Sequence, residues 1–507
     1  MAIIGKLIKA GIGINQKLNF DFTNDDNPQL NQLKNLLSKA KDTAFGKYYG
    51  FAKILDSDDI IMAFKGEVPI HGYEAMHDQW WCKQQIHPDI TWPGIPEFFA
   101  LSSGTTGKSS KRIPITDDFL QSMRDVGRSL IKELPNFDFP EEVFESEILM
   151  LSSSANLKEN TEGYLEGEIS GINVSNFPGY YDLFYRPGKE IAAIKDWDER
   201  VAAIVKEAPN WNIGAIAGIP SWVLLLLQEI VKRHKLKSIH DIWPNFAVFA
   251  SGGVAYETYR TDFDALCAKP IAIIDTYLAS EGFFAYSSRP DSMAMNLAVN
   301  HGYFYEFIPF DSRGVDETGA ILENPVTLTI DEVEENQDYV LIVSSCAGAW
   351  RYSIGDTIKF VNLKTNEIMI TGRTKFFLNV VGSQLSEEKM DAAIIEASQK
   401  MDVSVNEFSV AAVKNENGEY FHQWIVVTDD EFDCTKFKDL LDKSLTEANK
   451  NYKVARSKAL KGVKVESISK ETYHGFLAKS KKKGGQVKTP KVMTTEKMNE
   501  FLEFIKK

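Results

Sequence analysis

The chain has 507 residues, and its ordinary globular composition, 44% hydrophobic and 25% charged, excludes a wholly disordered or collagen-like protein. The formal charge of −14 argues against nucleic acid as a main partner, because affinity for phosphate backbones comes from clustered Lys and Arg. The four cysteines show no CxxC spacing, so they indicate neither a disulfide framework nor a zinc site and favour a reducing, cytoplasmic location.

Hydrophobic periodicity predicts alternating strands and helices. The first 18 residues predict an amphipathic surface helix rather than a signal peptide. The most apolar segment, 214–231, is interrupted at Pro220 and ends in charge, so it predicts a buried helix and no membrane partner. The other expected elements are strands at 147–151, 246–250, 271–274 and 339–344, with helices at 197–207 and 256–269.

After about residue 375 the pattern changes. Two β-type runs, EFSVAAV and YFHQWIVV, are followed by an amphipathic helix near 434–449 and the strand VKVESIS. These elements predict a small, mobile α+β lobe at 376–507, which follows a large N-terminal lobe at 1–375. The predicted fold class is α/β, with β-sheets covered by helices in the large lobe.

The segment 101–116 reads LSSGTTGKSSKRIPIT. Its glycines allow backbone N–H groups to approach an anion, its hydroxyls add donors, and Lys108 and Lys111 balance charge, so the composition is typical of a triphosphate-binding loop. A Walker loop would need Gly at the position of Ser102, so that pattern fails. A Ser/Gly-rich surface loop is an equal interpretation of this segment alone.

Three further segments carry polar groups next to apolar runs. In IAIIDTYLASEGFFA, a Tyr can stack on a base, a hydroxyl can donate to phosphate and a carboxylate can hold Mg²⁺, although a helix cap with an acidic first turn fits equally. In WRYSIGD, Asp356 follows Gly355 at an expected tight turn, where it can accept both ribose hydroxyls or simply form a hairpin. Gly252 and Gly253 follow a strand and would let a flat base lie against the backbone.

Together with TGRTKFFLNVVGSQL, these motifs resemble the acyl-adenylate-forming superfamily of acyl-CoA ligases, luciferases and peptide-synthetase adenylation domains. More closely, the chain is similar to the acyl-acid amido synthetases of the auxin-responsive Gretchen Hagen family, in particular to bacterial-type members. The segments that carry this closer match are VPIHGYE, SSGTTGKSSKRIP, DIWPNFAVFASGGV, YFYEFIPF, WRYSIGD and GGQVKTPKV.

The resemblance implies that the chain uses ATP and Mg²⁺. Residues that would contact the ATP phosphates are Ser102, Ser103, Gly104, Thr105, Thr106 and Ser280. Residues that would frame adenine are Gly252, Gly253 and Tyr277, while Asp356 would hold the ribose and Glu281 the metal. Ala279 stands where the family motif has a first hydroxyl, which leaves this phosphate contact to Ser280 alone.

The resemblance also implies roles for residues near the lobe boundary and the C-terminus. Arg373 and Lys375 would form the hinge between lobes, and Arg373 would also belong to the ATP-binding residues. Lys488 would reach the α-phosphate as the catalytic lysine. Lys483 and Lys491 are close enough in the sequence to compete with Lys488 for that role.

The predicted reaction is activation of a carboxylic acid as its acyl-adenylate, followed by transfer to an amine such as an amino acid. Arg124 and Arg128, one helical turn apart, could pair with a second carboxylate of the acid, or both could be solvated helix residues. An acyl-CoA ligase would share every ATP motif and differ in its acceptor, a non-catalytic nucleotide-binding module would bind ATP without reacting, and a structural scaffold would bind neither.

Overall fold

The computed structural model describes most of the chain. The described residues are 27–102, 111–177, 179–253, 256–290, 292–316, 319–374, 378, 383, 385–416, 419–458, 460–479 and 491–506. The amphipathic helix predicted for the first 18 residues lies outside them.

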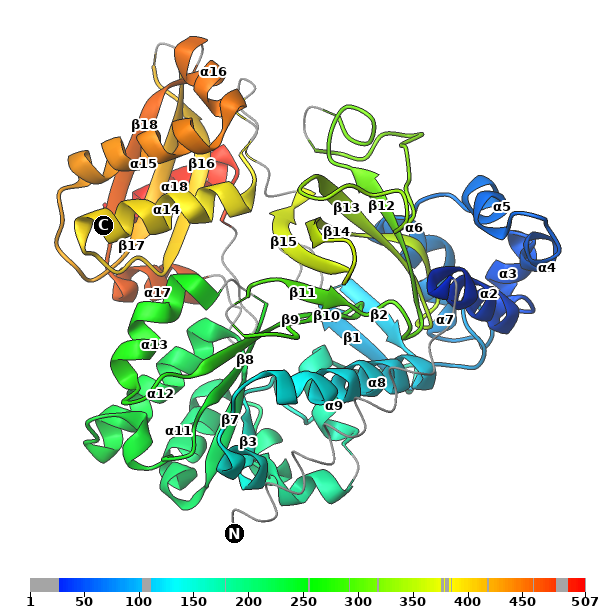
Figure 1. The fold of residues 1–507 in the computed structure, drawn as a ribbon, viewed down its shortest axis with the longest axis horizontal. Helices are drawn as coiled ribbons and strands as arrows, with labels where there is room; N and C mark the ends of the chain where they lie inside the picture. Colours follow the sequence, from blue (N-terminus) through cyan, green and yellow to red (C-terminus); the bar gives the residue numbers. More distant parts are fainter. Residues whose placement is uncertain are drawn as a thin grey trace.

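Among the described residues, eleven strands form one sheet that runs through the large lobe (Figure 1). In sheet order they are β12 (Tyr303–Pro309), β13 (Asp338–Ser345), β14 (Ala349–Asn362), β15 (Glu367–Arg373), β11 (Met295–Leu297), β10 (Gly282–Tyr286), β9 (Ala272–Ala279), β8 (Val248–Gly252), β7 (Ile213–Gly218), β3 (Glu147–Met150) and β6 (Tyr185–Arg186). From β9 to β6 the neighbours are parallel, and from β12 to β9 they are antiparallel. The carboxyl ends of the parallel strands therefore share one edge, where α/β proteins bind ligands.

Helices cover both faces of the parallel half. On one face lie α11 (Trp197–Glu207), α12 (Pro220–His234) and α13 (Arg260–Leu266), whose apolar side chains share a core with β3, β7 and β8. The proline that begins α12 is favoured at the first helical position, because its missing N–H would have no partner there. On the other face, α8 (Asp117–Glu133) lies across the strands (Figure 1).

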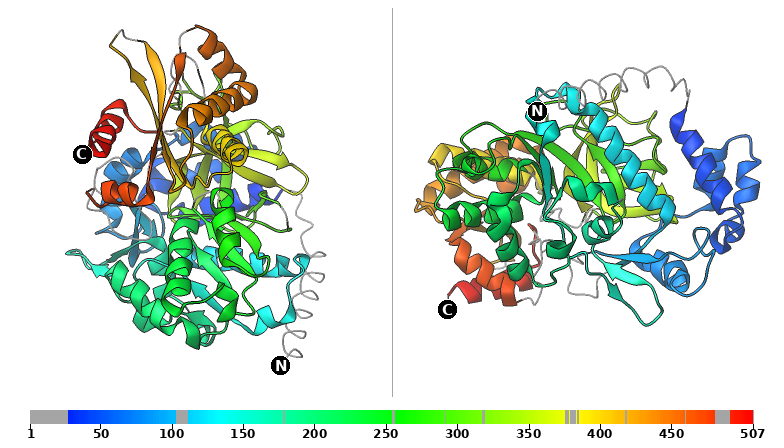
Figure 2. Two further views of the ribbon diagram at one scale, coloured as in Figure 1. Left: turned by 90° about the vertical axis from the view of Figure 1, so that its left-hand side faces the viewer. Right: turned by 90° about the horizontal axis from the view of Figure 1, so that it is seen from below.

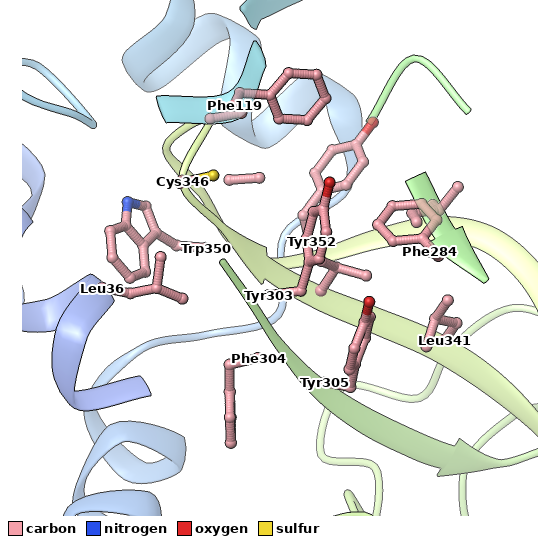
Figure 3. Close-up of a cluster of buried hydrophobic side chains, with 14 of the residues drawn as sticks. Leu36, Phe119, Phe284, Tyr303, Phe304, Tyr305, Leu341, Cys346, Trp350 and Tyr352 are labelled. Atoms are coloured by element: carbon pink, nitrogen blue, oxygen red, sulfur yellow. The ribbon is translucent and has the colours of Figure 1, made fainter. Parts of the chain in front are cut away.

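The antiparallel half is packed with aromatic side chains. Alternation along β12 places Tyr303 and Tyr305 side by side, while Phe304 points away from them (Figure 3). Helix α2 (Pro28–Ala40) is tied to this strand by Gln29, whose Nε2 donates to the Tyr303 carbonyl at 3.0 Å.

A second sheet has the order β2 (Lys111–Ile115), β1 (Phe98–Ser102), β5 (Leu165–Gly167) and β4 (Lys158–Glu159) within the described ranges. β1 and β2 are antiparallel and β1 and β5 are parallel, so the β1 and β5 chains leave the sheet at the same edge. This edge matters for the candidate site, because the predicted phosphate loop connects β1 to β2.

The small lobe has a separate core. Its described strands are β16 (Glu407–Lys414), β17 (Tyr420–Val427) and β18 (Leu460–Ile468), with β17 in the centre. Helices α14 (Glu387–Met401), α15 (Cys434–Ala448) and α16 (Lys450–Lys458) cover one face, and α17 (Lys470–Lys479) and α18 (Thr495–Ile505) the other (Figure 2).

Direct contacts join the small lobe to α13 and the turn before it. Tyr259 donates to Glu407, and the Ser404 hydroxyl donates to Asp262 at 3.2 Å. Lys470 forms an ion pair with Asp262 at 3.5 Å.

Most of the predicted elements in the described residues are present within a residue or two of their expected bounds, while two of them differ more in length. The helix expected at 256–269 is a 3₁₀ turn at Tyr256–Tyr259 followed by the shorter α13. The strand expected at 271–274 extends to Ala279, because its carboxyl half pairs with β10 as well as β8. In the described part of the chain, no helix is long and apolar enough to cross a membrane.

Candidate active site

The ends of β1 and β2 frame the predicted phosphate loop. Ser102 closes β1 and pairs in register with Lys111, the first residue of β2. The predicted phosphate-binding residues Ser103, Gly104, Thr105 and Thr106 lie in the connection 103–110, outside the described residues. The structure therefore positions both ends of this connection at one edge of the smaller sheet.

Asp356 is held between two donors from neighbouring strands. The Tyr277 hydroxyl on β9 donates to Asp356 Oδ2 at 2.6 Å, and Arg373 Nε on β15 donates to Oδ1 at 2.7 Å. The Asp356 residue is 5% exposed. Three residues that the sequence predicted separately are thus assembled into one polar cluster.

The local structure at Asp356 differs from the expected hairpin turn. Gly355 and Asp356 lie within the long strand β14, at a β-bulge where its register with β13 shifts between Val340 and Ile342. Gly355 has a φ of +89°, which favours glycine, and the bulge redirects the strand toward Arg373. The turn prediction failed because a Gly-Asp pair is equally compatible with a bulge.

Tyr277 is also placed differently from the expectation. Its ring is buried in the core of the large lobe and packs edge-on against Phe284, with ring centroids 5.2 Å apart. Burial and the neighbouring Asp356 carboxylate raise its pKa, so it acts as a neutral donor. In this structure Tyr277 holds Asp356, and stacking on adenine stays a prediction.

Ser280 and Glu281 form the two-residue turn between β9 and β10, because Ala279 pairs with Gly282. They are not the helix cap that the sequence also allowed. The pKa of Glu281 is raised, mainly by burial. Among its neighbours, Lys111 has the largest effect and lowers the pKa, Asp356 raises it, and Arg373 lowers it. The Glu281 carboxylate is therefore electrostatically coupled to the start of β2 and to the Asp356 cluster.

The glycine pair closes β8. A side chain at Gly252 would meet the Thr276 hydroxyl of β9 at 2.9 Å, so close strand pairing accounts for this glycine. Gly253 follows with a φ of +88° and is exposed. Both lie at the carboxyl end of a parallel strand, next to β9 and its Tyr277.

The two arginines on α8 lie in different surroundings. Arg124 is partly buried and donates to the Asn176 carbonyl at 3.2 Å. Arg128 has a side chain 58% exposed and forms an ion pair with Asp125 at 2.6 Å on the helix surface. Arg128 thus matches the solvated alternative, whereas a substrate role for Arg124 stays a prediction.

Lys491 is committed to an ion-pair network in the small lobe. Its Nζ lies 2.7 Å from both oxygens of Asp391 and 3.1 Å from Glu387, and its side chain is only 15% exposed. Lys483, Lys488 and the predicted hinge residue Lys375 lie outside the described residues. Of the three competing lysines, Lys491 therefore has an observed structural role.

Sequence reasoning missed the ion pair that joins two of the family segments. Arg351 donates to both oxygens of Glu306 at 2.9 and 2.8 Å, and both side chains are almost fully buried. Arg351 also donates to the carbonyls of Lys65 and Val68. One charge of each sign inside two apolar strands was the signal that could have revealed this pairing.

Models of one protein family match three parts of the chain. The GH3 family N-terminal domain matches residues 15–205, the central domain residues 296–373 and the C-terminal domain residues 388–497. This chain belongs to the GH3 family. The family predicted from the sequence is confirmed, and membership of its bacterial-type group stays a prediction.

Curated relatives in the GH3 family are distant. The indole-3-acetic acid-amido synthetase GH3.8 of Oryza sativa subsp. indica is 27% identical over 223 residues, which cover 41% of this chain and 36% of the relative. The jasmonoyl–L-amino acid synthetase GH3.5 of Oryza sativa subsp. japonica is 27% identical over 177 residues, which cover 32% of this chain and 30% of the relative. The chain thus matches well under half the length of these relatives.

Solved structures match nearly the whole GH3 chain. The GH3.15 acyl acid amido synthetase covers 96% of this chain and 94% of its own, with a TM-score of 0.75 at 15% identity. The 2-hydroxyisobutyryl-CoA ligase in the postadenylation state covers 94% of this chain and 92% of its own, with a TM-score of 0.58 at 12% identity. These likenesses establish an α/β adenylate-forming enzyme fold with a large N-terminal and a small C-terminal domain, which confirms the predicted fold class.

Proposed function

We propose that this GH3 protein uses ATP to convert a carboxylic acid into its acyl-adenylate and then transfers the acyl group to the amine of an amino acid. The names of its relatives, an indole-3-acetic acid-amido synthetase and a jasmonoyl–L-amino acid synthetase, support this reaction class. The observation that carries the proposal is the Tyr277–Asp356–Arg373 cluster, in which the buried Tyr277 and Asp356 meet the more exposed Arg373, and which Glu281 couples electrostatically to Lys111 at the start of β2.

Asp356 is suited to bind the ribose. Each carboxylate oxygen can accept two hydrogen bonds, and one on each oxygen is already made, from Tyr277 and from Arg373. One acceptor site per oxygen would serve the two ribose hydroxyls. Because the two donors fix the carboxylate before ATP arrives, little ordering entropy would be lost on binding.

Glu281 is suited to hold Mg²⁺ together with the ATP phosphates. Mg²⁺ prefers carboxylate oxygen and is usually bound by one or two carboxylates plus substrate phosphates rather than by an all-protein cage. In the described ranges, no group of three or more His, Cys, Asp or Glu side chains could hold a metal alone, which fits this mode. Burial raises the pKa of Glu281. A cation beside the carboxylate would lower this pKa again and thereby favour the ionised form. When bound, Mg²⁺ would neutralise charge on the phosphates.

Adenylation requires little covalent chemistry from the protein. The acid attacks the α-phosphorus, pyrophosphate leaves, and catalysis comes from positioning and charge stabilisation. In this proposal Ser102, residues 103–106 and Ser280 bind the phosphates. Gly252 and Gly253 border the adenine, and Lys488 stabilises the α-phosphate. Arg373 and Lys375 serve as the hinge that lets the small lobe change orientation between half-reactions.

A matrix of acids and acceptors tests the proposal. The acids are indole-3-acetate, jasmonate, 2,4-DB and benzoate, and the acceptors are the proteinogenic amino acids and CoA, with AMP release as the readout. We expect AMP release that needs both an acid and an amino acid. AMP release that needs an acid and CoA, but no amino acid, would assign the chain to the acyl-CoA ligases, whose fold it shares. ATP binding without any release of AMP would indicate a non-catalytic module.

A cytoplasmic location is part of the proposal. All four cysteines lie in the described ranges and are free, as expected in a reducing compartment. Fractionation of the source cells with an antibody against this chain would test it, and recovery in a secreted fraction would contradict it.

A further inference from the structure

A buried polar cluster lies at the end of β3, apart from the Asp356 cluster. We call it the Arg200 cluster and define it as Arg200 on α11, Tyr185 on β6, Glu168 after β5, and Ser152 and Ser153 after β3. Arg200 and Tyr185 are 4% and 3% exposed. Ser152, Ser153 and Glu168 are less deeply buried than these two residues.

Arg200 carries a buried positive charge without an ion-pair partner. One guanidinium nitrogen donates to the Ile194 carbonyl at 3.0 Å, and the guanidinium carbon lies 5.1 Å from the centre of the Trp197 ring. Its Nε has no hydrogen-bond partner among the residues that the structure describes, and the Glu168 and Asp196 carboxylates attract the guanidinium without a close ion pair. Burial accordingly lowers its pKa. A buried unpaired charge is costly, so an anion placed against Arg200 would be strongly favoured.

Two further polar groups of the cluster lie beside Arg200 and beside serine hydroxyls, Glu168 near Ser153 and Tyr185 near Ser152. Glu168 Oε2 and the Tyr185 hydroxyl are buried and form no hydrogen bond within the described structure. Burial raises the pKa of Glu168, and the nearby Arg200 lowers it. The cluster therefore offers a cationic donor, a carboxylate acceptor and a hydroxyl in one place. A small zwitterion with a carboxylate and an ammonium group has the matching chemistry.

Strand topology places the Arg200 cluster beside the predicted nucleotide site. β5 pairs in parallel with β1, with Gly167 opposite Ala100, so Glu168 leaves the smaller sheet one strand away from Leu101, near the carboxyl end of β1, or about 5 Å. Ser152 follows β3, which is two strand positions from β8 and Gly252, or roughly 10 Å. The cluster thus borders the region where an adenylate would form.

We propose that the Arg200 cluster binds the α-amino acid acceptor, with Arg200 holding its α-carboxylate and Glu168 its ammonium group. The inference rests on the proposed function and names the place and chemistry of its second substrate. Tyr185 adds a donor to the carboxylate. Because the thiol end of CoA has neither an ammonium group nor a carboxylate, the cluster also selects the amino acid over a thiol.

Hydroxylamine separates recognition of the acceptor from the chemistry of acyl transfer. It attacks an acyl-adenylate as an amine but has no carboxylate. Arg200→Lys keeps the positive charge and loses the planar fork that binds carboxylate bidentately. We expect it to raise KM for the amino acid by roughly 10- to 100-fold, as for loss of charged hydrogen bonds, and to leave hydroxamate formation with hydroxylamine unchanged.

Glu168→Gln is the second variant, because it keeps the size of the side chain and removes its charge. We expect a rise in KM for the amino acid of about tenfold or more, with pyrophosphate exchange in the absence of amine unchanged. Arg456→Lys is the matched control, since Arg456 pairs with Asp442 in the small lobe, far from the Arg200 cluster in the chain. It should leave KM for the amino acid unchanged.

The outcomes distinguish this inference from the proposed function. If the unchanged protein forms no adenylate with indole-3-acetate, jasmonate, 2,4-DB or benzoate, the proposed function fails and the inference with it. If the unchanged protein is active, equal losses with the amino acid and hydroxylamine, or no loss in either variant, would assign the cluster to structure or to bound water. If the melting temperature falls in Arg200→Lys alone, the KM of Glu168→Gln for the amino acid decides the test.

Discussion

At the scale of single residues, the structure separates a structural lysine from the lysine proposed for catalysis. Lys491 neutralises two carboxylates that are themselves largely buried, Asp391 and Glu387. Its pKa is lowered by burial but raised overall by these carboxylates, so it stays charged. Lys491→Ala should destabilise the small lobe by about 3–5 kcal/mol, because it leaves buried carboxylates unpaired.

Lys488→Ala should behave in the opposite way. We expect adenylation to fall by about 10²- to 10³-fold, as for removal of one preorganised charge-stabilising donor, with an unchanged melting temperature. Pyrophosphate exchange and a thermal melt on both alanine variants provide the comparison. A normal melt with lost exchange in Lys491→Ala would show that the phosphate contact was assigned to the wrong lysine.

Asp356 provides the second prediction at this scale. Ribose contacts differ little between the ground and transition states, so Asp356→Ala should act mainly on ATP binding. We expect KM for ATP to rise by about tenfold to a hundredfold, with a smaller change in kcat. Tyr277→Phe removes one donor and leaves the carboxylate, so its effect should be smaller. A fall in kcat without a rise in KM would contradict ribose binding by Asp356.

At the scale of the element, the bulge in β14 delivers Asp356 to its partners. Gly355→Ala meets no obstruction, since the nearest atom to an added Cβ is Thr374 Oγ1 at 3.6 Å. Its φ of +89° nevertheless disfavours a side chain, at a cost of about 1–2 kcal/mol. We expect a lower melting temperature together with a higher KM for ATP.

The control for the bulge is Gly66→Ala, in helix α5 (Ile60–Glu67), where an added side chain meets nothing within 4 Å. Alanine is favoured over glycine in a helix, so this variant should be at least as stable as the original chain. Equal effects of both substitutions would indicate that the bulge has no particular role in ATP binding.

The central strand of the small lobe contains a buried neutral histidine. His422 on β17 is fully buried, neither ring nitrogen has a partner in the described structure, and burial lowers its pKa from 6.5 to about 3. Between these values the unfolded chain binds a proton that the folded chain does not, so His422 makes the protein less stable as the pH falls.

His422→Phe should weaken that pH dependence. The free energy of unfolding of the variant should fall less between pH 6.5 and 4 than that of the original chain, as measured by urea denaturation at several pH values. His87→Phe, at an exposed position, is the control and should leave the pH dependence as it was. Parallel pH curves for His422→Phe and the original chain would contradict a neutral buried imidazole.

At the scale of the whole molecule, the sequence predicted local elements better than their assembly. The helix at Trp197–Glu207 matched its prediction, because its apolar residues recur with helical spacing and Asp196 caps its first turn. The α/β class and the small α+β lobe followed from the order of such elements. The antiparallel extension from β10 to β12 did not, since strand pairing between distant segments leaves little trace in a single sequence.

The candidate site shows the same division. The sequence identified Tyr277 and Asp356 as polar residues beside apolar runs, and the family resemblance added Arg373. Neither revealed that one carboxylate accepts from both neighbours. Nor did it reveal the partners Arg351 and Glu306, which lie 45 residues apart. Contacts of this kind depend on strand register and on a bulge, which one sequence does not determine.

Pyrophosphate exchange is the measurement that tests the account most directly. The protein is incubated with ATP, Mg²⁺, labelled pyrophosphate and the acid that gives most AMP in the matrix, without any amine. A free acyl-adenylate intermediate predicts acid-dependent return of the label into ATP, lost in Lys488→Ala and kept in Arg200→Lys. Exchange that begins only when an amino acid is added would contradict the intermediate and with it the proposed order of the two half-reactions.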